Sequence, residues 1–185
     1  PLLMTLDRMS KGDDALIRQA LQRPDSDVAF AALRTLAARE RLPGDAESLF
    51  TVLLTPSASE YTARLAAEVF RRHPQPWQPA LLLALLAKAP TTDTELTYAL
   101  RVALKAHVLT ADAATLRSWT ASDKPLANAA TAERVADICL AVPTPAAADF
   151  LLRHLKRTNF ADARAGDYAR HAVLHLPADN FSAIL

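Results

Sequence analysis

The chain has 185 residues, 51% of them hydrophobic, and its 21 Lys and Arg nearly balance its 20 Asp and Glu. This apolar content excludes a disordered linker, and the near-zero net charge disfavours nucleic acid as a partner. The chain contains 39 Ala and 30 Leu but only 11 Val plus Ile. Because Ala and Leu favour helices whereas β-branched residues favour sheets, the composition predicts an almost wholly helical protein.

Apolar residues recur at three- and four-residue spacing between prolines, which disrupt helix interiors. In chain order, this pattern predicts ten helices, at residues 13–22, 26–40, 45–54, 59–72, 77–89, 93–108, 112–120, 131–141, 145–157 and 164–176. Four helix starts carry capping signals. Ser26 and Ser59 are expected N-caps, Thr92 with Glu95 forms a capping box, and Thr144 precedes a proline at the first helical position.

The ten helices form five pairs, which begin near Asp13, Asp45, Trp77, Asp112 and Pro145. The pairs therefore recur at a regular interval of about 33 residues, within the range of helical repeat proteins. A single pair of this size buries too little apolar surface to be stable, so each must stack on the next. The period predicts an all-α superhelix, or solenoid, of about five antiparallel helix pairs in one domain, residues 1–185, with repeats near 13–42, 45–74, 77–109, 112–142 and 145–177.

The two ends of the chain, residues 1–4 and 182–185, are apolar. A solenoid needs polar terminal caps, so we expect this domain to be excised from a longer chain. The longest apolar run, Pro79 to Ala87, is about half of the roughly 20 residues that cross a bilayer, and we expect no membrane insertion. The single cysteine, Cys139, lies among apolar residues and is expected to be a buried thiol rather than a nucleophile.

One segment carries a family resemblance. Residues 24–36, PDSDVAFAALRTL, resemble the second-helix motif of HEAT repeats, although Ala29 stands where that motif usually has arginine. The triplet Ala-Leu-Arg at 32–34 returns at 99–101, which is two periods later. The resemblance implies a HEAT/armadillo-like fold and a non-enzymatic protein-binding or scaffolding module without a cofactor.

Two further stretches, residues 92–108 (TDTELTYALRVALKAHV) and 136–155 (ADICLAVPTPAAADFLLRHL), are similar to the HEAT-type region of large bacterial multidomain proteins. There, such a region sits beside sugar-dehydrogenase-like propeller, sugar-binding or cytochrome c modules. This resemblance implies a periplasmic or exported scaffold, with a protein segment or neighbouring domains of the same polypeptide as its partners. No haem attachment motif is present, because Cys139 stands alone.

In a HEAT array the second helices usually line the concave face, so the resemblance makes Tyr61, Tyr98 and Arg101 the candidate partner-binding residues. A solvated face without a partner is the alternative reading.

A candidate metal set lies on the last predicted helix. Asp167, His171 and His175 are spaced four apart and therefore share one face, where two imidazoles and a carboxylate could bind zinc. The preferred alternative is that the two histidines lie near the helix C-terminus and offset its dipole, while Asp167 favours the start of the helix.

A basic C-terminal region is the remaining candidate. Around His154 it combines five basic residues with two acidic ones, namely Arg153, Lys156, Arg157, Arg164 and Arg170 against Asp162 and Asp167. Such a region suits the alternative function, a HEAT-like DNA-binding or DNA-repair glycosylase-type protein. The balanced overall charge disfavours it, and Trp77, flanked by prolines, is expected to pack on the core rather than on a base.

Overall fold

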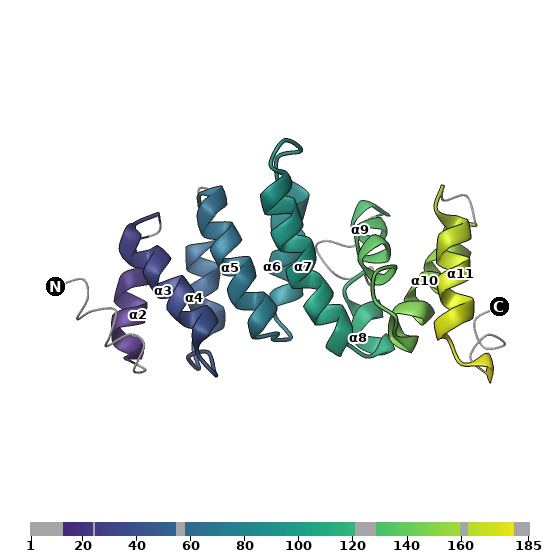
Figure 1. The fold of residues 1–185 in the computed structure, drawn as a ribbon, viewed down its shortest axis with the longest axis horizontal. Helices are drawn as coiled ribbons and strands as arrows, with labels where there is room; N and C mark the ends of the chain where they lie inside the picture. Colours follow the sequence, from purple (N-terminus) through teal and green to yellow (C-terminus); the bar gives the residue numbers. More distant parts are fainter. Residues whose placement is uncertain (1–12, 24, 55–57, 121–128, 160–162, 180–185) are drawn as a thin grey trace. The chain divides into compact units, whose positions relative to one another are not determined.

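The computed structural model describes residues 13–23, 25–54, 58–120, 129–159 and 163–179. These residues contain helices and no strand (Figure 1), which confirms the all-α prediction. The helices within this part of the chain are α2 (Asp14–Leu21), α3 (Asp27–Ala38), α4 (Ala46–Leu53), α5 (Glu60–Arg72), α6 (Gln78–Lys88), α7 (Thr94–Thr110), α8 (Ala113–Ser118), α9 (Ala129–Cys139), α10 (Pro145–Arg157) and α11 (Ala165–His175). Each corresponds to one of the ten predicted helices. The apolar chain ends and Asp162 lie outside the described residues.

Three of the four predicted helix caps are confirmed. The side chains of Ser26, Ser59 and Thr144 each accept a hydrogen bond from the backbone N–H three residues further on. Each cap satisfies one of the N–H groups that a helix start leaves without an intrahelical partner.

The predicted capping box of Thr92 and Glu95 is wrong. Asp93 Oδ1 accepts from the N–H of Leu96 at 2.8 Å, and Glu95 forms an ion pair with Arg64 of α5 instead. The hydrogen bond from the N–H of Leu96 is the largest cause that lowers the pKa of Asp93. An aspartate one residue further on is an equally good N-cap, and its charge also favours the positive end of the helix.

The chain divides into two compact units, Pro1–Ala103 and Leu104–Leu185, and the division falls within α7. We call them the N-terminal and C-terminal units and describe each by itself.

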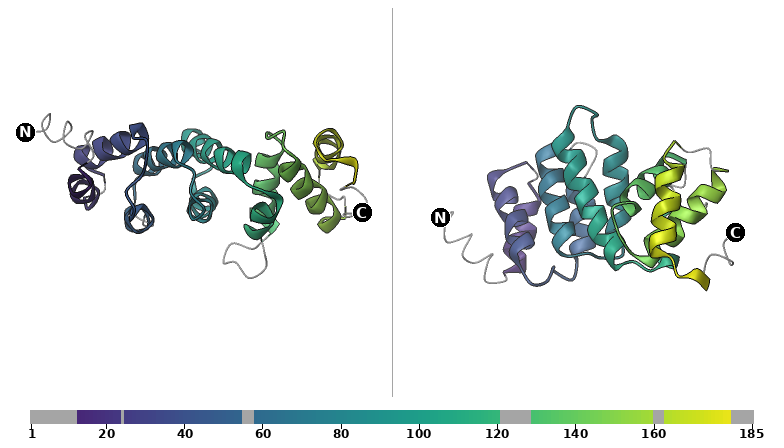
Figure 2. Two further views of the ribbon diagram at one scale, coloured as in Figure 1. Left: turned by 90° about the horizontal axis from the view of Figure 1, so that it is seen from below. Right: turned by 45° about the vertical axis from the view of Figure 1, so that its right-hand side comes forward.

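In the N-terminal unit the helices form two layers. α2, α4 and α6 lie in one layer, and α3, α5 and the beginning of α7 lie in the other (Figure 2). An aromatic cluster fills the space between the layers, with the rings of Phe50 and Phe70 4.6 Å apart and those of Phe70 and Trp77 5.4 Å apart. Trp77 thus packs onto the core, as its flanking prolines predict. The largest fully buried aliphatic side chains of this unit are Ile17, Leu33, Leu36, Leu53, Leu82 and Leu100.

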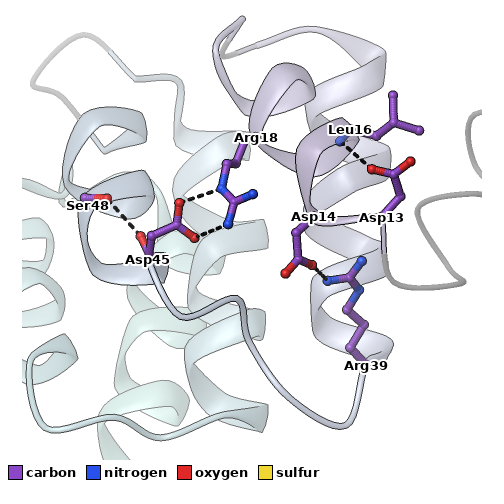
Figure 3. A network of polar contacts seen from close by, with 7 residues as sticks. All are labelled: Asp13, Asp14, Leu16, Arg18, Arg39, Asp45 and Ser48. Carbon is purple, nitrogen blue, oxygen red and sulfur yellow. Dashed lines mark hydrogen bonds and ion pairs between the residues drawn. The ribbon is translucent and has the colours of Figure 1, made fainter.

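Polar contacts join the helices of the N-terminal unit, both between successive pairs and within a pair. Arg18 on α2 donates two hydrogen bonds, of 2.6 and 3.0 Å, to the carboxylate of Asp45 at the start of α4 (Figure 3). Arg39, at the end of α3, reaches back to Asp14 on α2 at 2.5 Å. Asp25 has a φ of 62°, a conformation that aspartate tolerates better than most residues, and accepts from the N–H and hydroxyl of Ser59 in the next pair.

In the C-terminal unit, α10 packs against α8, α9 and α11. Small and aliphatic residues form a buried cluster between α10 and α11, with Ala148 and Leu152 on α10, Ala172 on α11 and Leu176 just after it. The side chain of Tyr168 is fully buried, and its hydroxyl donates to Asp137 Oδ1 on α9 at 3.0 Å. Among the described helices of both units, none is long and apolar enough to cross a membrane.

Candidate functional site

A row of polar side chains crosses the second helices of the N-terminal unit. Arg34 on α3 donates to the hydroxyl of Tyr61 on α5. The guanidinium of Arg64, also on α5, lies 5.9 Å from the centre of the Tyr61 ring and forms an ion pair with Glu95 on α7. We call these four residues the second-helix row. It links α3, α5 and the beginning of α7 through contacts at the protein surface.

Tyr61, one of the predicted partner-binding residues, is committed largely to this row. Its ring meets Phe30 of α3 edge-on at 4.7 Å, and the side chain is 37% exposed. An edge-to-face pair of this kind adds stability beyond the area it buries. Tyr61 therefore helps hold α3 against α5 and offers only part of its surface to a partner.

Tyr98 and Arg101 on α7 are placed differently. Tyr98 is 71% exposed, and Arg101 is also exposed. The two residues are three apart, so they lie on the same side of the helix. On the opposite side of α7, Leu96 and Leu100 are buried. A helix anchored by its apolar side thus presents an aromatic and a basic side chain to solvent.

A pocket of about 220 Å³ opens on the surface between α3 and α5, where its lining combines Leu33 and Leu65 with Arg34, Glu68 and Arg72. Hydrogen bonds and charge from Arg71 and then Arg72 lower the pKa of Glu68 to about 2. The Glu68 carboxylate therefore stays ionised, and it is already paired with Arg71 and Arg72. The lining of this pocket thus carries both negative and positive charge.

The structure brings together two members of the candidate metal set. The rings of His171 and His175 lie 4.5 Å apart, but Asp167 is exposed near the beginning of α11, whereas His171 is buried. The described residues contain no group of three or more His, Cys, Asp and Glu side chains that could hold a metal ion. Burial, followed by the neighbouring His175, lowers the pKa of His171. This favours a neutral, packed imidazole.

Cys139 is buried, and burial raises the pKa of its thiol to about 12. A thiol with so little thiolate at neutral pH is a poor nucleophile. The expectation that Cys139 is buried is confirmed.

The basic C-terminal region is partly neutralised and partly gathered into a pocket. Arg164 forms an ion pair with Asp137, and Arg153 pairs with Asp149 on its own helix. A pocket of about 220 Å³ lies beside α8 and α10. We call it the arginine pocket, and its lining residues are Arg117, Thr120, Phe150, Arg153, His154 and Arg157.

The basic region predicted from the sequence begins at Arg153 and does not include Arg117. A usable signal was present. Arg18 and Arg117 each follow the N-cap of a first helix by five residues, after Asp13 and Asp112, and each pairs with an acidic residue of the next first helix. The two acidic partners are not at equivalent positions, because Asp45 is the N-cap of α4 whereas Asp149 follows the N-cap of α10 by five residues. The repeat pattern therefore points to Arg117 but not to its partner.

The chain matches no family model, no curated protein and no solved structure. The function proposed below therefore depends on the residues and geometry of this chain.

Proposed function

We propose that the chain is a HEAT-like α-solenoid and acts as a non-enzymatic module that binds a protein segment or a neighbouring domain of the same polypeptide. The spacing of the helix starts supports the repeat. The first helices are preceded by Asp13, Asp45, Trp77, Asp112 and Thr144, which recur about every 33 residues, as helical repeats do. The second helices α3, α5 and α7 are capped by Ser26, Ser59 and Asp93, which follow one another with the same period.

Contacts between successive pairs also support the repeat. In a solenoid each repeat contacts only its neighbours, so tertiary contacts should join residues about one period apart. In the N-terminal unit Arg18 pairs with Asp45, and Asp25 bonds to Ser59. In the C-terminal unit Arg117 pairs with Asp149, again about one period further along the chain.

The exposed pair Tyr98 and Arg101 is the observation that carries the binding function. Tyrosine and arginine are enriched among the residues that contribute most to protein interfaces, because they combine a large apolar area with hydrogen-bonding groups. Both extend from a helix whose other side is buried, so a partner that covers them orders two side chains but no new backbone.

The test begins with the wild-type chain as bait in a lysate of the organism that encodes it. The retained protein is identified, purified and titrated calorimetrically against wild type and against Tyr98→Ala/Arg101→Ala. If both residues are central to the interface, the double variant should bind at least about 30-fold more weakly.

A matched control is available on α11. Arg170 and Val173 are also exposed and three residues apart, so Arg170→Ala/Val173→Ala removes a similar pair from another surface. We expect the control to bind like wild type. Equal affinities for wild type and the Tyr98/Arg101 variant would show that this face is not the interface.

A further inference from the structure

The arginine pocket collects positive charge from two helices of the C-terminal unit. Arg117 comes from α8, and Arg153 and Arg157 come from α10, one turn apart. Thr120, just after α8, adds a hydroxyl group to the lining. Three guanidinium groups around one small opening repel one another unless a carboxylate or a bound anion lies between them.

Asp149 supplies part of that compensation and orients two of the arginines. Its carboxylate is only 10% exposed, and Oδ2 accepts from Nη1 of Arg117 at 2.9 Å and from Nε of Arg153 at 3.1 Å. Each guanidinium has five N–H donors, so both arginines retain donors beyond those that face Asp149. A carboxylate that fixes two guanidinium groups in this way prepares them to bind a second anion.

The third arginine, Arg157, is held by another residue of the pocket lining, His154. Nη2 of Arg157 donates to Nδ1 of His154 at 3.1 Å, because a guanidinium has no acceptor. His154 is itself buried, and its ring is nearly parallel to that of Phe150 at 6.5 Å. Two buried rings thus line one part of the pocket, while the side chains of Arg117 and Arg153 remain 44% exposed and open to a ligand.

Charge and size together restrict the ligand. Three guanidinium groups against the single carboxylate of Asp149 leave a charge of +2 at the pocket. A phosphorylated side chain carries about −1.5 to −2 at neutral pH, whereas a carboxylate carries −1. The volume of about 220 Å³ is below that of typical pockets for drug-sized ligands, so the pocket suits one small anionic group.

We propose that the arginine pocket binds the phosphoryl group of a phosphorylated serine or threonine in a partner protein. This inference rests on the proposed protein-binding function and adds the chemistry of one contact. The observations favour a phosphopeptide over a nucleic acid for two reasons. The rings of Phe150 and His154 are buried and offer little surface on which a base could stack, and the chain has a net charge of only +1.

The probe is a fluorescein-labelled peptide mixture with a central phosphoserine and randomised flanking positions, titrated with the full chain and followed by fluorescence anisotropy. Parallel titrations use the same mixture with serine or glutamate at the centre, and a single-stranded oligonucleotide. Inorganic phosphate is added as a competitor. We expect the phosphoserine mixture to bind at least about tenfold more tightly than the serine and glutamate mixtures. Serine lacks the charged acceptor, and glutamate offers one negative charge and two oxygens in place of the higher charge and three oxygens of a phosphoryl group.

Variants locate the site. Arg157→Gln and Arg117→Lys should each weaken binding of the phosphoserine mixture about tenfold or more, the second because lysine keeps the charge but loses the planar fork. Arg170→Gln removes a charge from an exposed position on α11 and should bind like wild type. Circular dichroism confirms that each variant is folded, and two different substitutions keep the test valid if one of them unfolds.

Four results would overturn the proposal. These are equal affinity for the phosphoserine and serine mixtures, equal loss in Arg170→Gln and Arg157→Gln, tighter binding of the oligonucleotide than of any peptide, and inorganic phosphate that competes at the peptide's own dissociation constant. The last would indicate a site for free phosphate. The proposed function fails separately, if Tyr98→Ala/Arg101→Ala retains full affinity for the captured partner.

Discussion

His107 makes the stability of this protein depend on pH in a predictable direction. The side chain lies on α7 and is only 4% exposed, and its Nε2 is buried without a hydrogen-bond partner among the described residues. Burial lowers the pKa of the imidazole from 6.5 to about 4. The folded protein therefore keeps His107 neutral under conditions in which the unfolded chain protonates it.

The size of the effect follows from linkage. Between pH 6.5 and about 4 the unfolded state binds a proton that the folded state does not, so the free energy of unfolding falls as the pH falls. For these two pKa values, the loss between pH 7 and pH 5 is about 2 kcal/mol. His171 has a lowered pKa from the same first cause and contributes with the same sign.

The assay compares wild type with His107→Leu, which removes the titrating group and keeps a similar volume. Urea unfolding at pH 7 and pH 5, followed by circular dichroism, gives the free energy of unfolding of each protein. We expect wild type to lose about 2 kcal/mol more than the variant on acidification. Equal losses in the two proteins, or an NMR titration that places the pKa of His107 near 6.5, would refute the reasoning.

Three further predictions test the core, the caps and the cysteine. Phe70→Ala should lower the free energy of unfolding by about 3 to 5 kcal/mol, since it leaves a cavity beside Phe50 and Trp77, whereas exposed Tyr98→Ala should change it by less than about 0.5 kcal/mol; urea unfolding measures both. Asp93→Ala should lower the urea midpoint, and Thr92→Ala should leave it unchanged, because Asp93 is the observed cap of α7. A lower midpoint for Thr92→Ala but not for Asp93→Ala would instead support the capping box of Thr92 and Glu95. Cys139 should not react with a thiol reagent at pH 8 until the protein unfolds, because its pKa is about 12; rapid labelling of the native protein would contradict this.

The sequence alone located the helices of this protein, because the signals for helix position are local. Proline is disfavoured in helix interiors and so marks where helices end, and the spacing of apolar residues identifies the side of each helix that becomes buried. Caps such as Ser59 act within one turn, so no distant residue is needed to recognise them. The prediction at Thr92 was wrong. Thr92 and Asp93 are adjacent residues that can both cap a helix, and in the structure Asp93 is the cap while Glu95 pairs with Arg64 of the preceding helix pair.

The candidate sites depended on contacts that only the tertiary structure could supply. Tyr61 and Tyr98 have equivalent signals in the sequence, yet one is held by Arg34 and Phe30 while the other remains 71% exposed. Arg117 and Arg153 lie on different helices, far apart in the sequence, and meet because both bind Asp149. Helix periodicity determines which side of each helix faces inward, but the identity of the residue opposite it, about one repeat away, is fixed only when neighbouring helices pack.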